Sequence, residues 1–307
     1  MDRVLLIDGL NQIYRACVSF GPTKHHIQCN LSEENACLHK ANGSHCMCNA
    51  KWNVEEQWCY GDKFSFIFNF FRNIRPLVEA GSPDKIFFVL EGHPQFRYDL
   101  FPEYKGNRII KLGSKQDAKD KFNIVKNEII RLLQYLPITI ARAEHYEADD
   151  LISTLVDNMK EEDLTIITND NDYVQLLQRN YKHITIFNPI KKEIMESPKW
   201  NFIPFKALVG DKSDNLPRLV SDKKAAKYMS DPDAFQIFMA NNEHRSKFHI
   251  NRELIEFRNV PEEEIILKDG QRNFVELKKE FIRMDFQSIV NESSWQKYID
   301  TFSCVKY

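Results

Sequence analysis

The side chains best suited to chemistry in this chain of 307 residues are carboxylates, which gather in short clusters behind apolar runs. The densest cluster holds Glu147, Asp149 and Asp150 and leads into Leu151 and Leu155, which repeat at helical spacing. Acidic residues are ordinary in the first turn of a helix because its dipole favours negative charge, so this cluster alone predicts only a helix start. Further carboxylates follow other apolar runs: Asp8, Glu91, Asp170 and Asp172. Their chemistry depends on whether the fold brings them together.

Strand-like and helical patterns alternate up to about Pro189 and must position these carboxylates. Runs of β-branched and aromatic residues predict strands at Arg3–Ile7, Lys85–Leu90, Ile138–Ala141, Leu164–Thr168 and Ile184–Phe187. Apolar periodicity predicts helices at Asp62–Glu79, Gln116–Gln134, Asp149–Lys160 and Asp172–Arg179. This alternation predicts an α/β fold with a mainly parallel central sheet and helices on both faces. In such a sheet ligands bind beyond the carboxyl ends of the strands, where every acidic cluster falls.

Carboxylates crowded at one sheet edge predict a site for divalent cations. Like charges a few ångströms apart raise one another's pKa, and a bound divalent ion removes that cost. A set of carboxylates without histidine favours Mg²⁺ or Mn²⁺ over Zn²⁺. Two such ions about 4 Å apart can activate water and stabilise the leaving oxygen in phosphodiester hydrolysis. The simpler alternative is a set of unrelated helix caps and surface acids, and the shared sheet edge argues against it.

A segment that mixes cations with aromatic rings follows Glu91 directly. Residues 96–108 read Phe-Arg-Tyr-Asp-Leu-Phe-Pro-Glu-Tyr-Lys-Gly-Asn-Arg. Basic groups pair with phosphates and aromatic faces stack on unpaired bases, so the segment predicts contacts with nucleic acid. A solvated loop of mixed charge is the alternative. The expected contact residues in this segment are Arg97, Tyr104, Lys105 and Arg108.

Residues 22–60 interrupt the alternation with a polar segment that contains four His and five Cys. In a reducing compartment such cysteines are thiols or metal ligands more often than disulfides. Tetrahedral zinc is one interpretation of the insert, and a metal-free loop, favoured by the lack of Cys-x₂-Cys pairs, is the other. The residues available to zinc are Cys37, His45, Cys46, Cys48 and Cys59.

The character of the chain changes after about Pro189, where strand patterns become scarce and lysines accumulate. We therefore expect an α/β core over residues 1–188 and a mainly helical region over residues 189–307. The net charge of −2 and 43% hydrophobic content are ordinary, so any basic surface must come from local segregation of charge. No run approaches the roughly 18 apolar residues of a membrane span, and the first eight residues read as a strand rather than a signal peptide. We expect an intracellular protein without a membrane partner.

Five short motifs occur in the order typical of one enzyme family, over about residues 1–230. They are residues 6–9 (Leu-Ile-Asp-Gly), 96–97 with 102–108, 147–150 (Glu-Ala-Asp-Asp), 170–172 (Asp-Asn-Asp) and 210–217 (Gly-Asp-Lys-Ser-Asp-Asn-Leu-Pro). The sequence thereby resembles the 5′ nucleases: flap endonucleases, the 5′–3′ exonuclease domains of bacterial DNA polymerase I, and their bacteriophage relatives. The bacteriophage branch is the most similar. The resemblance implies a PIN-like nuclease fold and a cytoplasmic or nucleoid-associated enzyme.

The resemblance also implies roles for the carboxylates around two Mg²⁺ or Mn²⁺ ions. The first ion would be held by Asp8, Glu147, Asp149 and Asp150, with Glu91 at the position of a family aspartate. Asp170 and Asp172 would lie between the ions, and Asp170 would be indispensable for cleavage. The second ion would be held by Asp211 and Asp214.

The basic residues would handle the nucleic acid. Lys105 would contact the scissile phosphate with Arg108 nearby, and Tyr104 would stack on a base, within a helical arch over residues 93–123. Duplex contacts would come from Lys212, Lys223, Lys224 and Lys227. The expected substrates are DNA with a 5′ flap, a nick or a free 5′ end, and the RNA of RNA–DNA hybrids is a second candidate. We expect a monomer that removes primers or flaps during replication.

Two departures from the family pattern keep alternatives open. Glu91 replaces an aspartate, and residues 218–227 lack the glycines of the family's DNA-binding helical hairpin. A catalytically weakened nucleic-acid-binding protein on the same scaffold is therefore one alternative. A PIN-type ribonuclease is another, although a minimal PIN domain lacks the 210–217 motif and the Tyr104, Lys105 and Arg108 group.

Overall fold

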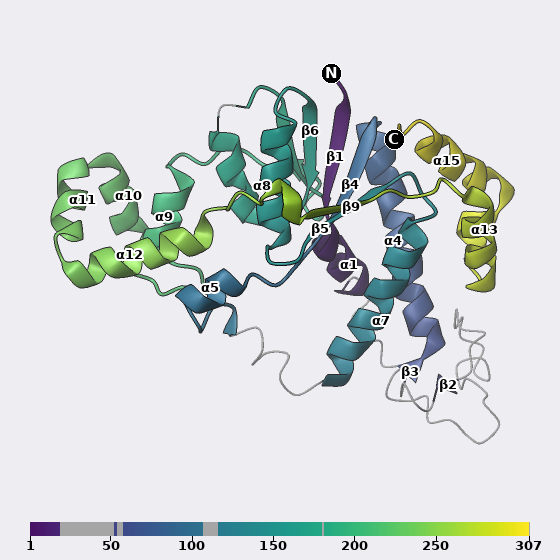
Figure 1. The fold of residues 1–307 in the computed structure, drawn as a ribbon, viewed down its shortest axis with the longest axis horizontal. Helices are drawn as coiled ribbons and strands as arrows, with labels where there is room; N and C mark the ends of the chain where they lie inside the picture. Colours follow the sequence, from purple (N-terminus) through teal and green to yellow (C-terminus); the bar gives the residue numbers. More distant parts are fainter. Residues whose placement is uncertain (19–51, 54–57, 107–115, 180, 307) are drawn as a thin grey trace. The chain divides into compact units, whose positions relative to one another are not determined.

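The computed structural model describes the backbone of residues 1–18, 52–53, 58–106, 116–179 and 181–306 (Figure 1). Within it the chain divides into two compact units. Unit 1 contains Met1 with residues 89–116 and 141–266, and unit 2 contains residues 2–88, 117–140 and 267–307. The predicted boundary at residues 188 and 189 stays a prediction. No helix of the described residues is long and apolar enough to cross a membrane.

Seven strands form one mostly parallel sheet in the order β8-β7-β6-β1-β4-β5-β9. Their bounds are β1 Arg3–Asp8, β4 Lys85–Leu90, β5 Thr139–Ala143, β6 Asp163–Ile167, β7 Ile184–Asn188, β8 Glu193–Ile194 and β9 Ile265–Lys268. Strand β7 pairs parallel to β6, with Leu164 opposite Ile184, whereas β8 runs antiparallel to β7. The predicted α/β fold with a mainly parallel sheet is confirmed, and the five predicted strands differ from the observed ones only at their ends.

Unit 1 combines its strands with short helices, of which α9 to α12 form one group (green in Figure 1). The helices are α5 Gln95–Leu100, α8 Ala148–Asn158, η1 Asn171–Gln178, α9 Phe202–Val209, α10 Asp222–Ser230, α11 Pro232–Met239, α12 Asn242–Ile255 and η2 Glu262–Glu264. Their core contains Leu208, Phe238 and Phe248, and Tyr104 is buried in the same cluster. Burial of apolar surface thus joins Tyr104 to these helices. Tyr104 belongs to the aromatic–basic segment, the sequence stretch 96–108 in which cations alternate with aromatic rings.

One predicted helix differs in type, because residues 171–178 form the 3₁₀ helix η1 rather than an α-helix. Its first turn is tightened by the side chain of Asp170, which accepts a hydrogen bond from the backbone N–H of Asp172 at 2.9 Å. Aspartate often caps a turn in this way, and 3₁₀ turns are common in short connections.

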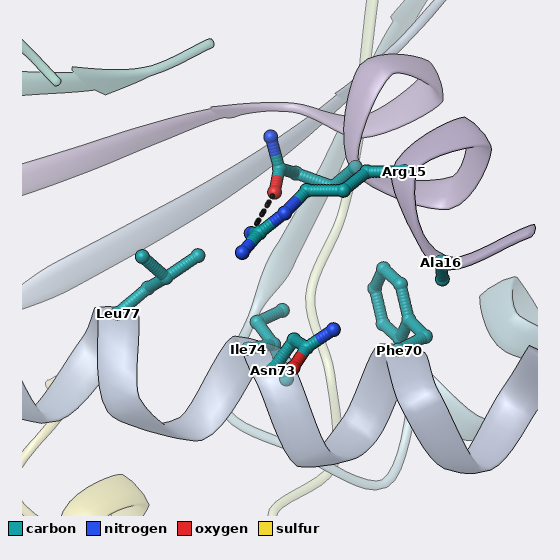
Figure 2. Close-up of a pocket in the computed structure, with 7 residues that line it drawn as sticks. Arg15, Ala16, Phe70, Asn73, Ile74 and Leu77 are labelled. Atoms are coloured by element: carbon teal, nitrogen blue, oxygen red, sulfur yellow. Dashed lines mark hydrogen bonds between the residues drawn. The ribbon is translucent and has the colours of Figure 1, made fainter. Parts of the chain in front are cut away.

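Unit 2 packs α1 (Gly9–Val18) against α4 (Tyr60–Gly81). Figure 2 shows a small hollow where they meet, in which Arg15 of α1 donates to Gln12 at 3.3 Å and faces Leu77 of α4. The remaining helices are α7 Gln116–Leu133, α13 Phe274–Arg283, α14 Gln287–Val290 and α15 Glu292–Ser303. The short strands β2 (Trp52–Asn53) and β3 (Trp58–Cys59) pair antiparallel. Four of the predicted zinc ligands, Cys37, His45, Cys46 and Cys48, lie outside the described residues.

Candidate functional site

The carboxylates of residues 147–150 begin helix α8 in unit 1. Glu147 is the N-cap, and a capping box joins its side chain to the third helical residue while Asp150 accepts from the backbone N–H of Glu147 at 3.2 Å. One face of helix α8 packs into the core, because Leu151 and Leu155 are buried, as their spacing predicts. The buried apolar face therefore holds the acidic turn in place.

Asp150 is completely buried and paired with Arg97 of α5, which is 1% exposed. Nη1 and Nη2 of Arg97 donate to the two carboxylate oxygens at 2.5 and 2.7 Å, and the backbone N–H of Arg258 adds a third hydrogen bond at 2.8 Å. Burial lowers the pKa of Arg97, but the hydrogen bonds to Asp150 and the negative charges of Asp150 and Glu147 together outweigh burial and raise that pKa above its usual value. An expected phosphate contact by Arg97 would require this pair to open.

Glu147 is surrounded by donors from the aromatic–basic segment. Lys105 Nζ lies 2.5 Å from Oε1, and Oε2 has Tyr104 Oη at 3.1 Å and Arg97 Nη1 at 3.3 Å. Burial raises the pKa of Glu147, but Lys105 and Arg97 outweigh it and lower the pKa below the usual range. Tyr104 is 3% exposed, so base stacking by this ring would require it to leave the core.

The aromatic–basic segment is also fixed to the loop that follows α9. The backbone N–H of Lys105 donates to the carbonyl of Asp214 at 3.0 Å, and the side chain of Asn215 donates to the carbonyl of Glu103 at 3.0 Å. Lys105 has a φ of 55° and Asn215 a φ of 63°, so both occupy the left-handed region. The structure thereby brings Lys105 next to the 210–217 motif. Arg108 lies outside the described residues.

A second cluster joins Asp172 of η1 to Asp211 and Asp214 of the loop after α9. Among the described residues, these three carboxylates offer ligand oxygens within 4.8 Å of one another. The loop turns at Gly210, whose φ is 71° and where an added Cβ would lie 2.7 Å from two backbone oxygens. Reciprocal backbone hydrogen bonds between Asp211 and Leu216, at 3.2 and 2.7 Å, close the turn.

Lys206 of α9 inserts its ammonium group into this cluster. Its Nζ contacts Asp172 Oδ1 and lies 2.7 Å from Asp211 Oδ2. Burial raises the pKa of Asp172 to about 6 despite Lys206, whereas Lys206 and Ser213 overcome burial and lower the pKa of Asp211 to about 2. The pKa of Lys206 is raised, because its two carboxylates outweigh the opposing effect of burial.

The other predicted ligands are held by separate contacts. Asp149 accepts a hydrogen bond from Tyr173 Oη at 2.9 Å, and Asp170 caps η1. Glu91 precedes Gly92, whose N–H donates to the carbonyl of Tyr146 at 2.8 Å. An added Cβ at Gly92 would lie 2.0 Å from a backbone oxygen, so glycine is required there.

Asp8 belongs to unit 2, where it ends β1 and accepts a hydrogen bond from the N–H of Asn11 at 3.2 Å. It is 7% exposed. Its position at the end of a buried strand agrees with the sequence pattern, and its role as a ligand stays a prediction.

The lysines expected to bind duplex DNA are exposed. Lys223, Lys224 and Lys227 lie on α10, and Lys212 lies in the 210–217 loop. Sequence reasoning assigned no role to Lys206 or Tyr173. Lys206 lies on α9, and Asp211 follows five residues later in the loop after that helix. The sequence carries no signal that the side chain of Lys206 turns toward the acidic cluster.

Comparison with known proteins identifies the family. Residues 3–202 match the 5′-3′ exonuclease, N-terminal resolvase-like domain. The chain belongs to the 5′-3′ exonuclease family. The expected resemblance to 5′ nucleases is thereby confirmed.

Two relatives show how far the similarity to other members of this nuclease family extends. A 5′-3′ exonuclease of Mycoplasmopsis pulmonis is 33% identical over 162 residues, 50% of this chain and 52% of that protein. A thermostable DNA polymerase I of Thermus filiformis is 28% identical over 183 residues, 56% of this chain and 21% of that protein. The matched part of the chain thus spans about half of the first protein and about a fifth of the second.

Solved structures share the nuclease fold. The D15 protein of bacteriophage T5, co-crystallised with metal ions, aligns with a TM-score of 0.55 and 16% identity over 99% of both chains. Flap endonuclease-1 of Methanococcus jannaschii aligns with a TM-score of 0.59 and 13% identity over 99% of this chain and 93% of that one. The predicted PIN-like fold with bacteriophage-like neighbours is confirmed.

Proposed function

We propose that this chain is a divalent-metal-dependent, structure-selective 5′ nuclease that hydrolyses phosphodiester bonds of DNA. The observation that carries the proposal is the convergence of Asp172, Asp211 and Asp214, whose oxygens lie within 4.8 Å. The backbone of Lys105 is hydrogen bonded to the same loop. The sequence motifs of the family supply both sets of residues, and this contact supports their assignment to one site.

The donor set fits a divalent cation that prefers oxygen ligands. Asp172 and Asp211 share Lys206, and burial raises the pKa of Asp172 despite that lysine, so further positive charge would stabilise the ionised cluster. Mg²⁺ or Mn²⁺ would supply that charge and, when bound, would activate water and stabilise the leaving oxygen. The proposed ligands are Asp8, Glu91, Glu147, Asp149, Asp170, Asp172, Asp211 and Asp214. Asp150, which the sequence predicts as a further ligand, would instead support the site through its pair with Arg97.

The protein's own side chains divide the remaining work. Lys105 carries a cation beside Glu147 and would donate hydrogen bonds to a non-bridging phosphate oxygen, where negative charge accumulates in phosphoryl transfer. Asp150 would act mainly through Arg97, which fixes the acidic turn, because both its oxygens already accept hydrogen bonds. Lys212, Lys223, Lys224 and Lys227 would pair with the duplex backbone.

The proposed partner is DNA with a 5′ flap, a nick or a free 5′ end. Two of the structurally similar proteins were solved with DNA: the T5 flap endonuclease with DNA and metal ions, and human GEN1 with Holliday junction DNA. RNA in RNA–DNA hybrids is a further proposed substrate, and removal of primers or flaps inside the cell is the proposed role. We also propose that the protein acts as a monomer.

Cleavage assays test the proposal. Full-length protein is incubated with 5′-labelled flap, nicked and single-stranded DNA and with RNA, in Mg²⁺ and in EDTA. We expect cleavage of DNA in Mg²⁺ only. If no substrate is cleaved, the chain is better described as a catalytically weakened nucleic-acid-binding protein. If RNA alone is cleaved, the PIN-type ribonuclease is favoured.

A single substitution tests the acidic site. Asp170→Asn should reduce DNA cleavage by at least about 10²–10³-fold while DNA binding in Ca²⁺ is retained. Asp233→Asn, at an exposed aspartate of α11, is the matched control and should cleave like the wild type. An active Asp170→Asn enzyme would refute the two-metal proposal.

A further inference from the structure

Lys206 contributes an ammonium group to the acidic cluster of Asp172, Asp211 and Asp214. Its Nζ contacts Asp172 and Asp211 together, and its side chain is 12% exposed. The Phe202 ring, one helical turn earlier on α9, has its centroid 5.7 Å from Nζ. A lysine held in this way acts as an internal counter-ion for two of the three carboxylates.

The atoms that Lys206 uses are those a metal ion would need. Oδ1 of Asp211 already accepts hydrogen bonds from the N–H and Oγ of Ser213, at 2.7 and 2.6 Å. Its Oδ2 receives Lys206, so both oxygens of Asp211 have donors. Oδ1 of Asp172 also receives Lys206. An ion bridging Asp172 and Asp211 would lie a few ångströms from the ammonium group, where like charges repel strongly in a partly buried site.

A permanent ion pair is the simpler explanation of this geometry. The charge balance of the two carboxylates that Lys206 contacts argues against permanence, since one ammonium group leaves Asp172 and Asp211 together with a net charge of about −1. Burial raises the cost of that remaining charge, and a divalent ion in place of the lysine would cancel the charge of both carboxylates. Lys206 therefore holds the two carboxylates together without neutralising them.

We propose that Lys206 is a displaceable internal cation of the second metal site, which holds Asp172 and Asp211 together without metal and competes with the incoming ion for their oxygens. This inference rests on the proposed function. It implies that the chain has lower affinity for the second ion than its carboxylates alone would give. Lys206 would also keep the ligands Asp172 and Asp211 close together before the ion binds.

Metal titration without DNA tests the competition. Binding of Mn²⁺ to the full chain is measured by calorimetry and by electron paramagnetic resonance for the wild type, Lys206→Met and Lys206→Gln. We expect both variants to bind the weaker class of Mn²⁺ about 10–100-fold more tightly, the range typical of changes around metal ligands. Lys206→Arg, which keeps the charge, and Lys191→Met, at an exposed lysine, should remain near the wild type.

Thermal unfolding gives a second readout. In EDTA, Lys206→Met should unfold at a lower temperature than the wild type, because Asp172 and Asp211 lose the cation that they share. Added Mn²⁺ should raise the unfolding temperature of this variant more than that of the wild type. Unchanged or weaker Mn²⁺ binding by both neutral variants would overturn the inference, and so would equal tightening in Lys206→Arg. In either case a wild-type enzyme that cleaves DNA with Mg²⁺ leaves the proposed function standing, whereas a wild type that binds no divalent ion and cleaves nothing overturns both.

Discussion

Replacing Arg97 by methionine should destabilise the protein strongly, because it leaves the buried carboxylate of Asp150 without its cation. Asp150 is 0% exposed and receives both amino groups of Arg97. After the substitution only backbone donors such as the N–H of Arg258 would remain. Methionine retains much of the apolar stem of arginine, so the change isolates the charge and its hydrogen bonds.

The expected magnitude follows from the burial of both partners. Removing one member of a buried, hydrogen-bonded ion pair costs about 3–5 kcal/mol, since the other charge stays buried and unpaired. For domains of 150–250 residues, roughly 2–4 °C of melting temperature corresponds to each kcal/mol. We therefore expect the melting temperature of Arg97→Met to fall by about 6–20 °C. A surface pair such as Arg252 and Glu256, 48% and 40% exposed, should contribute at most about 1 kcal/mol.

The assay is thermal and urea unfolding in EDTA, so that bound metal does not compensate for lost charge. Arg252→Met is the matched control, because it removes an arginine from an exposed pair of the same unit. The double variant Arg97→Met with Asp150→Asn should lose less stability than the two single variants added together. A loss for Arg97→Met no larger than that of Arg252→Met would refute the idea that this pair holds the acidic turn.

Two further predictions concern single contacts. Tyr173→Phe should lower the free energy of unfolding in EDTA by about 1.5–3 kcal/mol, because Asp149 loses a hydroxyl donor at 2.9 Å. Denaturant unfolding measures this loss, and an unchanged midpoint would contradict it. Asp84 has a pKa lowered to about 2 by the backbone N–H of Arg3 and by Lys306, so its stabilising effect is present above about pH 4 and disappears as the pH falls to about 2. Asp84→Asn should therefore be less stable than the wild type at pH 7, and the difference in melting temperature should shrink below pH 4; a constant difference would refute the assignment.

The sheet could be predicted from the sequence because its signals are local. Strand β4 coincides with the predicted Lys85–Leu90, and the buried face of α8 follows from the spacing of Leu151 and Leu155. Alternating strands and helices then predict the parallel sheet. The 3₁₀ form of η1 was not predicted, because apolar spacing over eight residues does not distinguish a 3₁₀ helix from an α-helix.

The acidic residues of the site could also be listed from the sequence, but not their partners. Arg97 meets Asp150 across 53 positions of the chain, and Lys206 meets Asp172 across 34. Such pairs depend on tertiary packing, and nothing in the spacing of the residues specifies which cation reaches which carboxylate. Arg97 was expected at a phosphate for this reason, since a basic residue beside aromatic rings has the same local appearance whether it is buried or exposed.

Three cations with little exposed surface also change what the density of carboxylates means. Close carboxylates predict metal ions that keep them ionised, yet Arg97, Lys105 and Lys206 each already neutralise part of the site. Two of these cations differ from the third in what they leave for a metal. Arg97 is bidentate and fully buried, so it belongs to the scaffold, whereas Lys105 and Lys206 are single ammonium groups on flexible stems. In the proposed second metal site, an incoming ion would therefore compete with Lys206 for the oxygens of Asp172 and Asp211.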